Sequence, residues 1–446
     1  MNAIMLEAFA VILIPVIAGI LALKEYRISS VAASAIEVLI SIAIFLSGNS
    51  SGIFYINAVS KVFILMVASV YLLSTIYSME YLEKGTWLRH SYYFLLFNFF
   101  TASMMFALTI NNYGLMWVGI EATTISSAIL IMTEKTEIST EATWRYILIV
   151  SAGVTFAFIS IILIYYNFGT LDVSSILSRS PGNSLVLRLI VSISLVGFGT
   201  KVGIFPVHTW LPDAHSESPA PVSAMFSGVL LPTALYVVYT IYRIDEFHEL
   251  YIWAGTVSVV FASIFLGSQR KYKRMFAYST MENMSIALIG FATGTVVGIA
   301  GALLLLVAHS FGKASAFYSS GNVLKSYGEK DIERVSGVAR AMPVTGSSLI
   351  LSSLAVTGTP PFGTFFGEFL ILYAVYSGGY IIPFVLLAIF IPVAFISVNY
   401  NVTRMAFGHE SKMRENNRRM PYIALVPAII SLAVGIGFLV VTYALV

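Results

Sequence analysis

The sequence contains no cysteine and few charged residues. Without cysteine, the chain offers no thiol chemistry, no disulfide and no thiolate ligand for an iron–sulfur cluster. Charged residues make up 11% of its 446 residues, whereas a soluble domain carries about 25%. The patterns GxxxxGK[ST], GxGxxG and HExxH are also missing. These absences argue against a soluble enzyme, a nucleotide-binding fold and a hydrolytic zinc site in this chain.

Long apolar runs dominate what is present. Hydrophobic residues make up 58% of the chain, and the mean hydropathy is +0.87. A helix needs about 20 apolar residues to cross the bilayer core. The first run has no basic residues before it and no cleavage site of small residues, so we expect that helix to stay. Fourteen candidate spans follow, near 3–22, 29–48, 56–79, 91–110, 113–133, 144–167, 184–210, 220–243, 250–268, 274–294, 297–323, 345–377, 380–403 and 421–445.

The basic residues predict the orientation of these spans. Of the 25 lysines and arginines, 19 fall in the odd-numbered loops and 3 in the even-numbered loops. Lys61, Lys201 and Lys313 are left inside spans. Positive residues collect on the cytoplasmic side of a membrane protein. We therefore expect a multi-pass protein of the cytoplasmic membrane, with the odd loops inside the cell and both termini outside.

Two of the spans, the seventh and the twelfth, are too long for one straight crossing, and both are interrupted. Gly203 and Pro206 break the seventh, and Pro360 and Pro361 break the twelfth. An offset of five spans reverses the orientation of the second unit, which is typical of inverted repeats in transporters. The alternative is a pair of proline kinks without function. The predicted fold is all-α and polytopic, with about fourteen helices and two inverted five-helix repeats that each hold one broken helix. The expected parts are helices 1–3 (1–90), the first repeat (91–245), the second repeat (250–408) and helix 14 (420–446).

The first candidate ion-path residues are Glu121 in the fifth span and Lys201 in the seventh. Ionisable residues inside a membrane are costly and therefore point to function. Because desolvation disfavours a lone carboxylate, we expect Glu121 to be protonated or paired, with Lys201 as its partner. The alternative is a static ion pair that fixes helix packing. The broken segment after Lys201 adds three more candidates, His208, Asp213 and His215.

A second group of ionisable residues follows in the spans after it. His309 and Lys313 are four residues apart, which places them on one face of the eleventh helix. With Glu282 or Glu368 nearby, they could form a proton relay. The alternatives are a hydrogen-bonded core histidine and a lysine that extends toward the cytoplasm. His309 lacks the second histidine that a membrane haem needs, and Glu7, Glu37 and Lys61 are not assigned a role.

These residues lie within segments that resemble a known family. The segment 201–215 reads KVGIFPVHTWLPDAH, and 219–231 reads PAPVSAMFSGVLL. Further segments read AYSTMENM (277–284) and GTPPFGTFFGEF (358–369). Together they resemble the antiporter-like membrane subunits of respiratory complex I, of multi-subunit cation/proton antiporters and of membrane-bound group 4 hydrogenases. The segments GIEATT (119–124) and EKDIER (329–334) are most similar to hydrogenase component F.

The resemblance implies a role for each charged residue. Glu121 and Lys201 would be the paired charges of a first half-channel. His309 and Lys313 would belong to the central polar axis, and Glu368 would end the second half-channel. One departure concerns the eighth span, where complex I relatives have a Leu-Leu-Lys-Thr pattern. This chain has Pro232 at the lysine position, which leaves the link between the half-channels open.

We therefore interpret the chain as an ion-translocating subunit, for H⁺ or for Na⁺/H⁺, of a redox-driven complex. It would be the non-redox subunit of a hydrogenase-like or NADH–quinone dehydrogenase-like enzyme. No cofactor or metal is expected in this chain, and iron–sulfur clusters and other redox centres are expected in partner subunits. The expected partners are other membrane subunits, including further antiporter-like ones, and the lipid bilayer, but no nucleic acid. The alternatives are a stand-alone secondary transporter of a small solute or cation, and a structural scaffold.

Overall fold

The computed structural model describes residues 3–82, 86–179, 185–409, 413–415 and 419–445. Of the basic residues counted above, Lys84, Lys412 and Arg418 lie outside these ranges. The fold is all-α, apart from the two-residue strands β1 (Ser50–Ser51) and β2 (Tyr55–Ile56), which pair antiparallel. Among the described residues, 11 helices have the length and composition to cross a membrane. The polytopic helical fold is therefore confirmed, and the total of fourteen spans and the inverted repeats stay predictions.

The chain forms two compact units that interleave along the sequence. Unit 1 comprises Met1–Thr75, Leu82–Gly203 and Val229–Phe247, and unit 2 comprises Ile76–Tyr81, Ile204–Gly228 and His248–Val446. The chain passes from unit 1 to unit 2 at Gly203, which is where the predicted break in the seventh span begins. A further passage follows Phe247, between the two predicted repeats.

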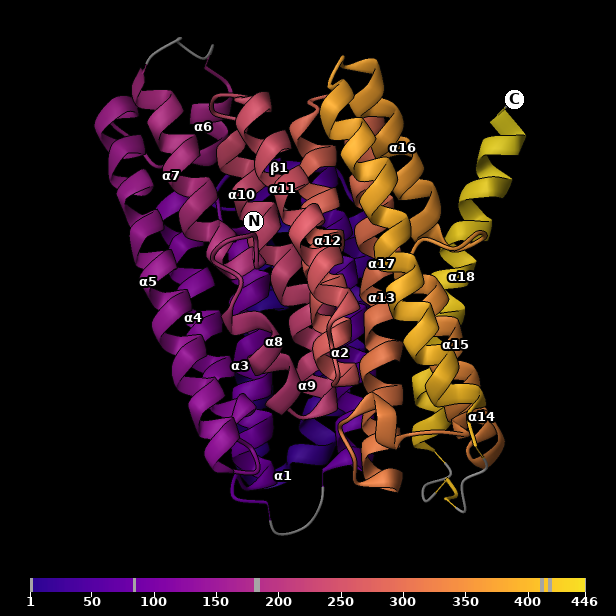
Figure 1. The fold of residues 1–446 in the computed structure, drawn as a ribbon. Helices are drawn as coiled ribbons and strands as arrows, with labels where there is room; N and C mark the ends of the chain where they lie inside the picture. The colour runs from indigo at the N-terminus through magenta and orange to yellow at the C-terminus, as the bar shows by residue number, and fades with distance from the viewer. Residues whose placement is uncertain (1–2, 83–85, 180–184, 410–412, 416–418, 446) are drawn as a thin grey trace. The chain divides into compact units, whose positions relative to one another are not determined.

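Unit 1 contains the helices that hold Glu121 and Lys201. Glu25 leaves the helical backbone (φ −140°, ψ 80°) and divides α1 between the first two predicted spans. Helix α3 packs against α4, α4 packs against α5, and α5 packs against α7 (Figure 1). The helices of this unit are α1 (Ala3–Leu46), most of α2 (Ala58–Tyr81), α3 (His90–Thr109), α4 (Tyr113–Ile131), α5 (Glu137–Phe168), α6 (Val173–Leu177), α7 (Leu185–Val202) and α10 (Leu231–Tyr242).

Small residues allow α5 and α7 to approach closely near Lys201. A side chain added at Gly153 would overlap Thr200, and one added at Gly197 would overlap the backbone of Ala157. In a membrane, helices associate through such close packing, because lipid provides no hydrophobic drive between them. This contact fixes the position of the last turn of α7, which holds Lys201.

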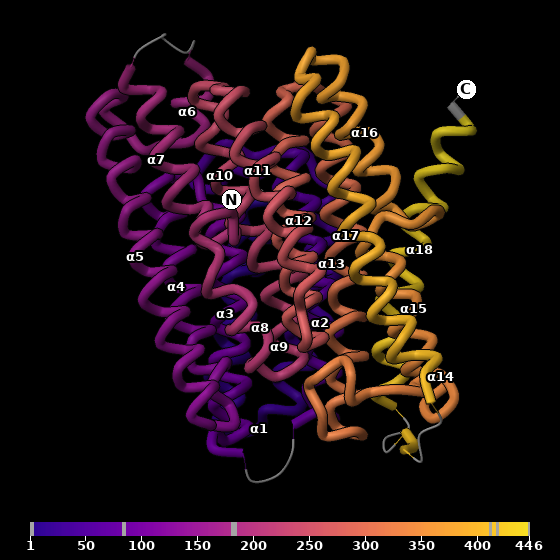
Figure 2. Tube along the Cα trace, viewed as in Figure 1, coloured from indigo at the N-terminus to yellow at the C-terminus, as the bar shows by residue number. Residues whose placement is uncertain are grey.

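Unit 2 contains the second group of ionisable residues. Helix α13 packs against α12, α15, α16 and α18, and Figure 2 follows the same helices as a tube. The helices are α8 (Trp210–Glu217), α9 (Ala220–Met225), α11 (His248–Gly267), α12 (Tyr272–Ala292), α13 (Val296–Tyr327), the 3-10 helix η2 (Ile332–Arg334), α14 (Val338–Ala341), α15 (Pro343–Val356), α16 (Gly363–Ser377), α17 (Ile381–Phe407) and α18 (Met420–Leu445).

Both predicted interruptions fall between helices. Helix α7 ends at Val202, Gly203 has a φ of +84°, and α8 begins at Trp210. Helix α15 ends at Val356, Gly358 has a φ of +66°, and α16 begins at Gly363. A positive φ is accessible to glycine because it has no Cβ, so each helix turns sharply at a glycine.

Proline also changes the eighth predicted span. A π-helix, η1 (Phe226–Leu230), separates α9 from α10, and Pro232 lies in the first turn of α10. Because Pro232 has no N–H, the carbonyl of Gly228 four residues earlier loses its usual donor. The Ser310 hydroxyl donates to that carbonyl at 2.5 Å. A backbone carbonyl in a buried helix is thereby satisfied by α13.

Candidate functional site

Lys201 lies in the last turn of α7, and its side chain is fully buried. Its Nζ donates to the Thr124 hydroxyl at 2.9 Å and to the Tyr146 hydroxyl at 2.7 Å. A second hydroxyl, that of Ser127, lies 2.7 Å from the Tyr146 hydroxyl. Lys201 is therefore held by neutral oxygens from α4 and α5.

Glu121 lies one turn before Thr124 on α4. Its Oε1 accepts a hydrogen bond from Ser151 on α5 at 2.7 Å, while its Oε2 makes no hydrogen bond among the described residues. No direct ion pair joins Glu121 to Lys201 within the described part of unit 1. Sequence reasoning expected Lys201 to be the partner of Glu121. The structure places both in one polar cluster, in which hydroxyl groups bind the lysine and a serine binds the carboxylate.

Lys313 occupies the middle of α13 and is also fully buried. Its Nζ donates to the backbone carbonyl of Phe276 at 2.7 Å and to the hydroxyl of Ser279, both on α12. His309 lies one turn away on α13 and is fully buried as well. As in unit 1, the described residues place no carboxylate in direct contact with the lysine.

Two carboxylates complete this second cluster. Glu282 on α12 is 3% exposed, and it interacts electrostatically with both Lys313 and Glu368. Glu368 on α16 is 6% exposed. A Cβ at Gly358 would overlap Oε2 of Glu368. The glycine at the break in the twelfth span is thus required for space as well as for its backbone angle.

Glu368 also lines a groove of about 400 Å³ between the α15–α16 break and α17. The other side chains of this groove are almost all apolar, among them Phe365, Phe369 and Phe395. In unit 2, Lys313 therefore interacts with Glu282, Glu282 interacts with Glu368, and Glu368 lines the groove. The structure brings together four of the predicted ion-path residues here, namely Glu282, His309, Lys313 and Glu368.

The remaining three predicted residues make further contacts, although His215 also interacts electrostatically with Lys313. Asp213 on α8 forms an ion pair with Arg274 at 2.6 Å. His215 is fully buried and stacks on Phe317, with ring centroids 5.1 Å apart. His208 is 4% exposed and stacks on Phe265 at 5.6 Å. Asp213 therefore anchors α8, and the two histidines pack against aromatic rings.

A second ion pair and a backbone contact hold α8 in place. Glu217 pairs with Lys330 at 2.8 Å, and Lys273 donates to the Ser218 carbonyl at 2.5 Å, just beyond the end of α8. Burial raises the pKa of Glu217, but the hydrogen bond and positive charge of Lys330 lower it more, so its pKa lies below its usual range. These contacts fasten the segment that follows the break in α7.

Several residues of these clusters are not among those predicted from the sequence, although Thr124 and Ser279 lie inside the segments 119–124 and 277–284. Thr124, Tyr146 and Ser279 are ordinary hydroxyl residues of a helix until the fold places them against a lysine. Glu37 is different, because Ser30, Ser34, Glu37 and Ser41 share one helical face of α1 and are all fully buried. Neither carboxylate oxygen of Glu37 makes a hydrogen bond among the described residues. That polar stripe could have been found by its spacing.

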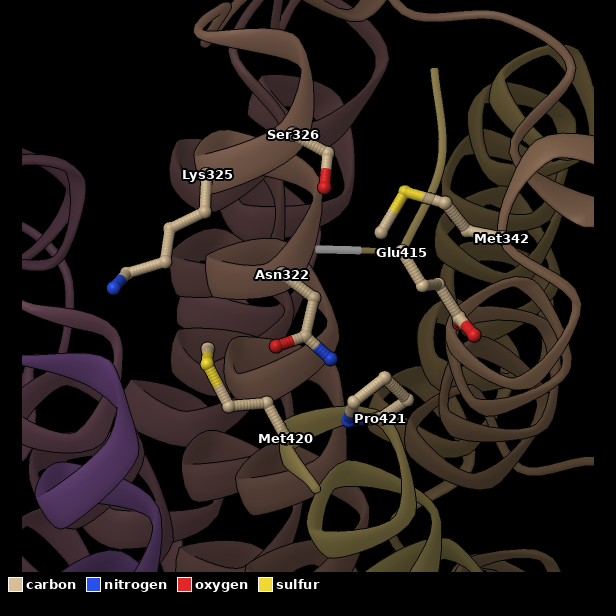
Figure 3. A pocket seen from close by; sticks show the side chains of 7 residues that line it. All are labelled: Asn322, Lys325, Ser326, Met342, Glu415, Met420 and Pro421. Carbon is tan, nitrogen blue, oxygen red and sulfur yellow. The ribbon is translucent and has the colours of Figure 1, made fainter. Parts of the chain in front are cut away.

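A small cavity lies near the C-terminal end of α13 (Figure 3). The backbone N–H of Thr345 donates to the Glu415 carboxylate at 2.8 Å, which caps α15. Asn322 donates to the Thr345 hydroxyl at 3.2 Å. The cavity of about 30 Å³ has room for a water molecule and little more. Of its polar side chains, Glu415 caps a helix.

The fold is a helical bundle with interrupted helices and with buried lysines and carboxylates. These features define a multi-pass membrane protein of the ion-transport type. A family model described as "NADH:quinone oxidoreductase/Mrp antiporter, TM" matches residues 110–396. The Hydrogenase-4 component F homolog of Methylacidiphilum infernorum is 31% identical over 401 residues, which cover 83% of this chain and 84% of that protein. The chain belongs to this NADH:quinone oxidoreductase/Mrp antiporter family.

Solved structures share the fold. A chain of the Mrp complex from Dietzia sp. DQ12-45-1b superposes with a TM-score of 0.91 at 18% identity, covering 99% of this chain and 96% of that one. A chain of the membrane-bound sulfane sulfur reductase, described as an archaeal respiratory membrane complex, gives 0.87 at 23% identity, with coverages of 96% and 94%. At these identities the likeness concerns the fold alone.

Proposed function

We propose that this chain translocates H⁺, or exchanges Na⁺ for H⁺, as an antiporter-like membrane subunit of a redox-driven respiratory complex. The observation that carries the proposal is the way in which the two fully buried lysines, Lys201 and Lys313, are held. A fully buried charge without a counterion is costly, so a direct carboxylate contact is expected if these two lysines are permanently charged and only hold helices together. Lys201 and Lys313 instead contact neutral oxygens, with carboxylates further along the same clusters.

Such an arrangement suits proton transfer. A lysine held by hydroxyl and carbonyl oxygens can release and regain a proton without breaking an ion pair. In unit 1, a change of charge near Glu121 alters the proton affinity of Lys201, since the two groups share one cluster. In unit 2, Lys313, Glu282 and Glu368 provide successive proton-binding groups, and His309 lies beside them.

The redox reaction belongs to other subunits in this proposal. The name of the hydrogenase relative and the description of the family model support a hydrogenase-like or complex I-like parent. Iron–sulfur clusters and other redox centres would lie in those partner subunits, together with further antiporter-like subunits in the membrane. Coupling would then be electrostatic, through a charge change passed to Glu121 from a neighbouring subunit.

Purification and reconstitution test this function. The tagged chain should co-purify in mild detergent with an iron–sulfur subunit, and the complex should move H⁺ or Na⁺ in vesicles when the redox substrate is added. Glu121→Gln should assemble normally and abolish translocation, because glutamine retains the shape without the charge. A chain that purifies alone and transports a solute would support the stand-alone transporter. Normal pumping by assembled Glu121→Gln would leave Glu121 with a structural role.

The orientation in the cytoplasmic membrane is part of the proposal, with both termini outside. Because the chain has no cysteine, single cysteines can be labelled without background. His409→Cys should be protected from an impermeant maleimide in intact cells, and Leu185→Cys should react. Both positions are exposed in the structure. The reverse pattern would contradict the orientation that the basic residues predict.

A further inference from the structure

A polar cavity of about 390 Å³ lies in unit 2, and none of its lining residues belongs to either lysine cluster. The end of α11, the last turns of α17 and η2 form its walls. Helices α11 and α17 pack against each other, which keeps these walls together. The polar and charged side chains that line it are Ser268, Gln269, Arg270, Glu333, Ser397, Tyr400, Asn401 and Arg404.

The charged groups of this cavity have no counterions among the residues that the structure describes. Neither Arg270 nor Arg404 forms an ion pair with any of them, and the same holds for Glu333. The neighbouring Arg334, in contrast, contacts Glu329 at 3.4 Å. Arg404 lies over the Tyr400 ring, with its guanidinium carbon 5.7 Å from the ring centroid. The cavity therefore presents two positive groups and one negative group to a ligand.

An apolar stripe leads into the cavity along α17. Val385, Ile389, Val393 and Ile396 recur at helical spacing and are 47%, 52%, 38% and 63% exposed. Tyr400 continues the same face, one turn further on. Only 22% of the most apolar part of α17 is buried inside the protein. A helix face of this kind is suited to an acyl chain.

We propose that the cavity binds the headgroup of a phospholipid that carries a primary amine, such as phosphatidylethanolamine. Arg270 and Arg404 would bind the phosphate, because guanidinium groups match phosphate oxygens in charge and geometry. Glu333 would bind the ammonium group. One acyl chain would follow the stripe from Ile396 toward Val385. The two arginines and the glutamate match a zwitterionic headgroup better than a purely anionic one.

This inference is independent of ion translocation, so it can fail while the proposed function holds. The orientation predicted from the basic residues places Arg270 and Arg404 at the cytoplasmic side, where tyrosine and arginine commonly meet lipid headgroups. A partner subunit could cover the same face instead. The apolar stripe on a helix of this length favours lipid, and the experiment distinguishes the two.

The test uses the assembled complex, delipidated in detergent and supplied with phosphatidylethanolamine, phosphatidylglycerol or phosphatidylcholine. Native mass spectrometry measures bound lipid and its affinity. Wild type should prefer phosphatidylethanolamine. Arg270→Gln and Arg404→Gln should each weaken binding about tenfold, as expected for loss of a charge-assisted hydrogen bond. Glu333→Gln should keep phosphate binding but lose the preference for phosphatidylethanolamine over phosphatidylglycerol.

Arg334→Gln is the matched control, because it removes an adjacent arginine that already has a partner. It should bind lipid like wild type. Equal phosphatidylethanolamine binding by wild type and by the Arg270→Gln, Arg404→Gln double variant would overturn the proposal. So would crosslinking of this face to a partner subunit through photoreactive residues at Ser397 and Asn401. A uniform loss in every variant, the control included, would also count against a specific headgroup site.

Discussion

The two fully buried lysines, Lys201 and Lys313, differ in the groups that accept their hydrogen bonds. Among the described residues, Lys201 donates to side-chain hydroxyls alone, those of Thr124 and Tyr146. Lys313 donates to a backbone carbonyl, that of Phe276, as well as to a hydroxyl. A backbone acceptor stays in place as long as α12 is folded, whereas side-chain acceptors depend on residue type. The position of Lys201 should therefore be more sensitive to substitution of its neighbours than the position of Lys313.

The carboxylates of the two clusters also differ. Glu121 is partly exposed and is bound by Ser151, whereas Glu282 and Glu368 are both buried. Glu368 adjoins a groove, and a glycine leaves it space. Unit 1 thus offers one lysine with one carboxylate, and unit 2 offers a lysine with two carboxylates and a histidine. Within the proposed function, unit 2 is suited to carry protons over the greater distance.

The largest expected effect comes from removing Lys313. Lys313→Ala should stop ion translocation in vesicles, because the chain has Pro232 at the place where relatives are expected to have a further base. In that background, Pro232→Lys should restore part of the activity by supplying a lysine from α10. Assembly must be checked first, since Pro232 also determines which donor binds the Gly228 carbonyl. Full pumping by Lys313→Ala alone would remove the lysine from the path.

The next prediction compares the hydrogen-bond acceptors of Lys201 with those of Lys313. Tyr146→Phe with Thr124→Val removes both acceptors of Lys201 and should slow translocation by about tenfold or more, given the strength of such hydrogen bonds. Ser279→Ala leaves the Phe276 carbonyl to hold Lys313 and should have a smaller effect. Initial rates in vesicles, normalised to assembled complex, measure the difference. Equal losses would show that the backbone acceptor does not distinguish the two clusters.

A glycine substitution tests the packing around Glu368. Gly358→Ala should reduce translocation markedly, because its Cβ would overlap the carboxylate. Gly328→Ala is the control, since Gly328 has a similar φ of +70° but no atom within 4 Å of an added Cβ. Both variants carry the same backbone strain, so any excess loss in Gly358→Ala reports on the displaced carboxylate. Similar activities would argue that Glu368 can move without consequence.

The smallest expected effect concerns the ion pairs that hold α8. The pKa of Glu217 is lowered in the folded protein, so its pair with Lys330 stabilises the fold above the ordinary carboxyl pKa. That stabilisation is lost as the pH falls through the lowered pKa, below about pH 4.5. Wild type should therefore lose more thermal stability than Glu217→Gln between about pH 5 and pH 3. Parallel melting curves across this range would contradict a contribution from the pair.

The sequence by itself determined the membrane class. In lipid, backbone N–H and C=O groups must bond to one another within a helix, and the apolar runs are long enough to form helices that cross the bilayer. It also determined where the chain breaks, since Gly203, Pro206, Pro360 and Pro361 act locally on the backbone. The family followed from contiguous segments such as 201–215, which need no fold to be recognised.

The tertiary structure alone decided which groups meet. Tyr146 and Ser279 accept hydrogen bonds from Lys201 and Lys313 because the packing of separate helices places them there. Asp213 holds α8 because it forms an ion pair with Arg274. The sequence could not predict these contacts, since hydrogen bonds and ion pairs depend on distances of about 3 Å between helices, and helix spacing and rotation arise only from packing.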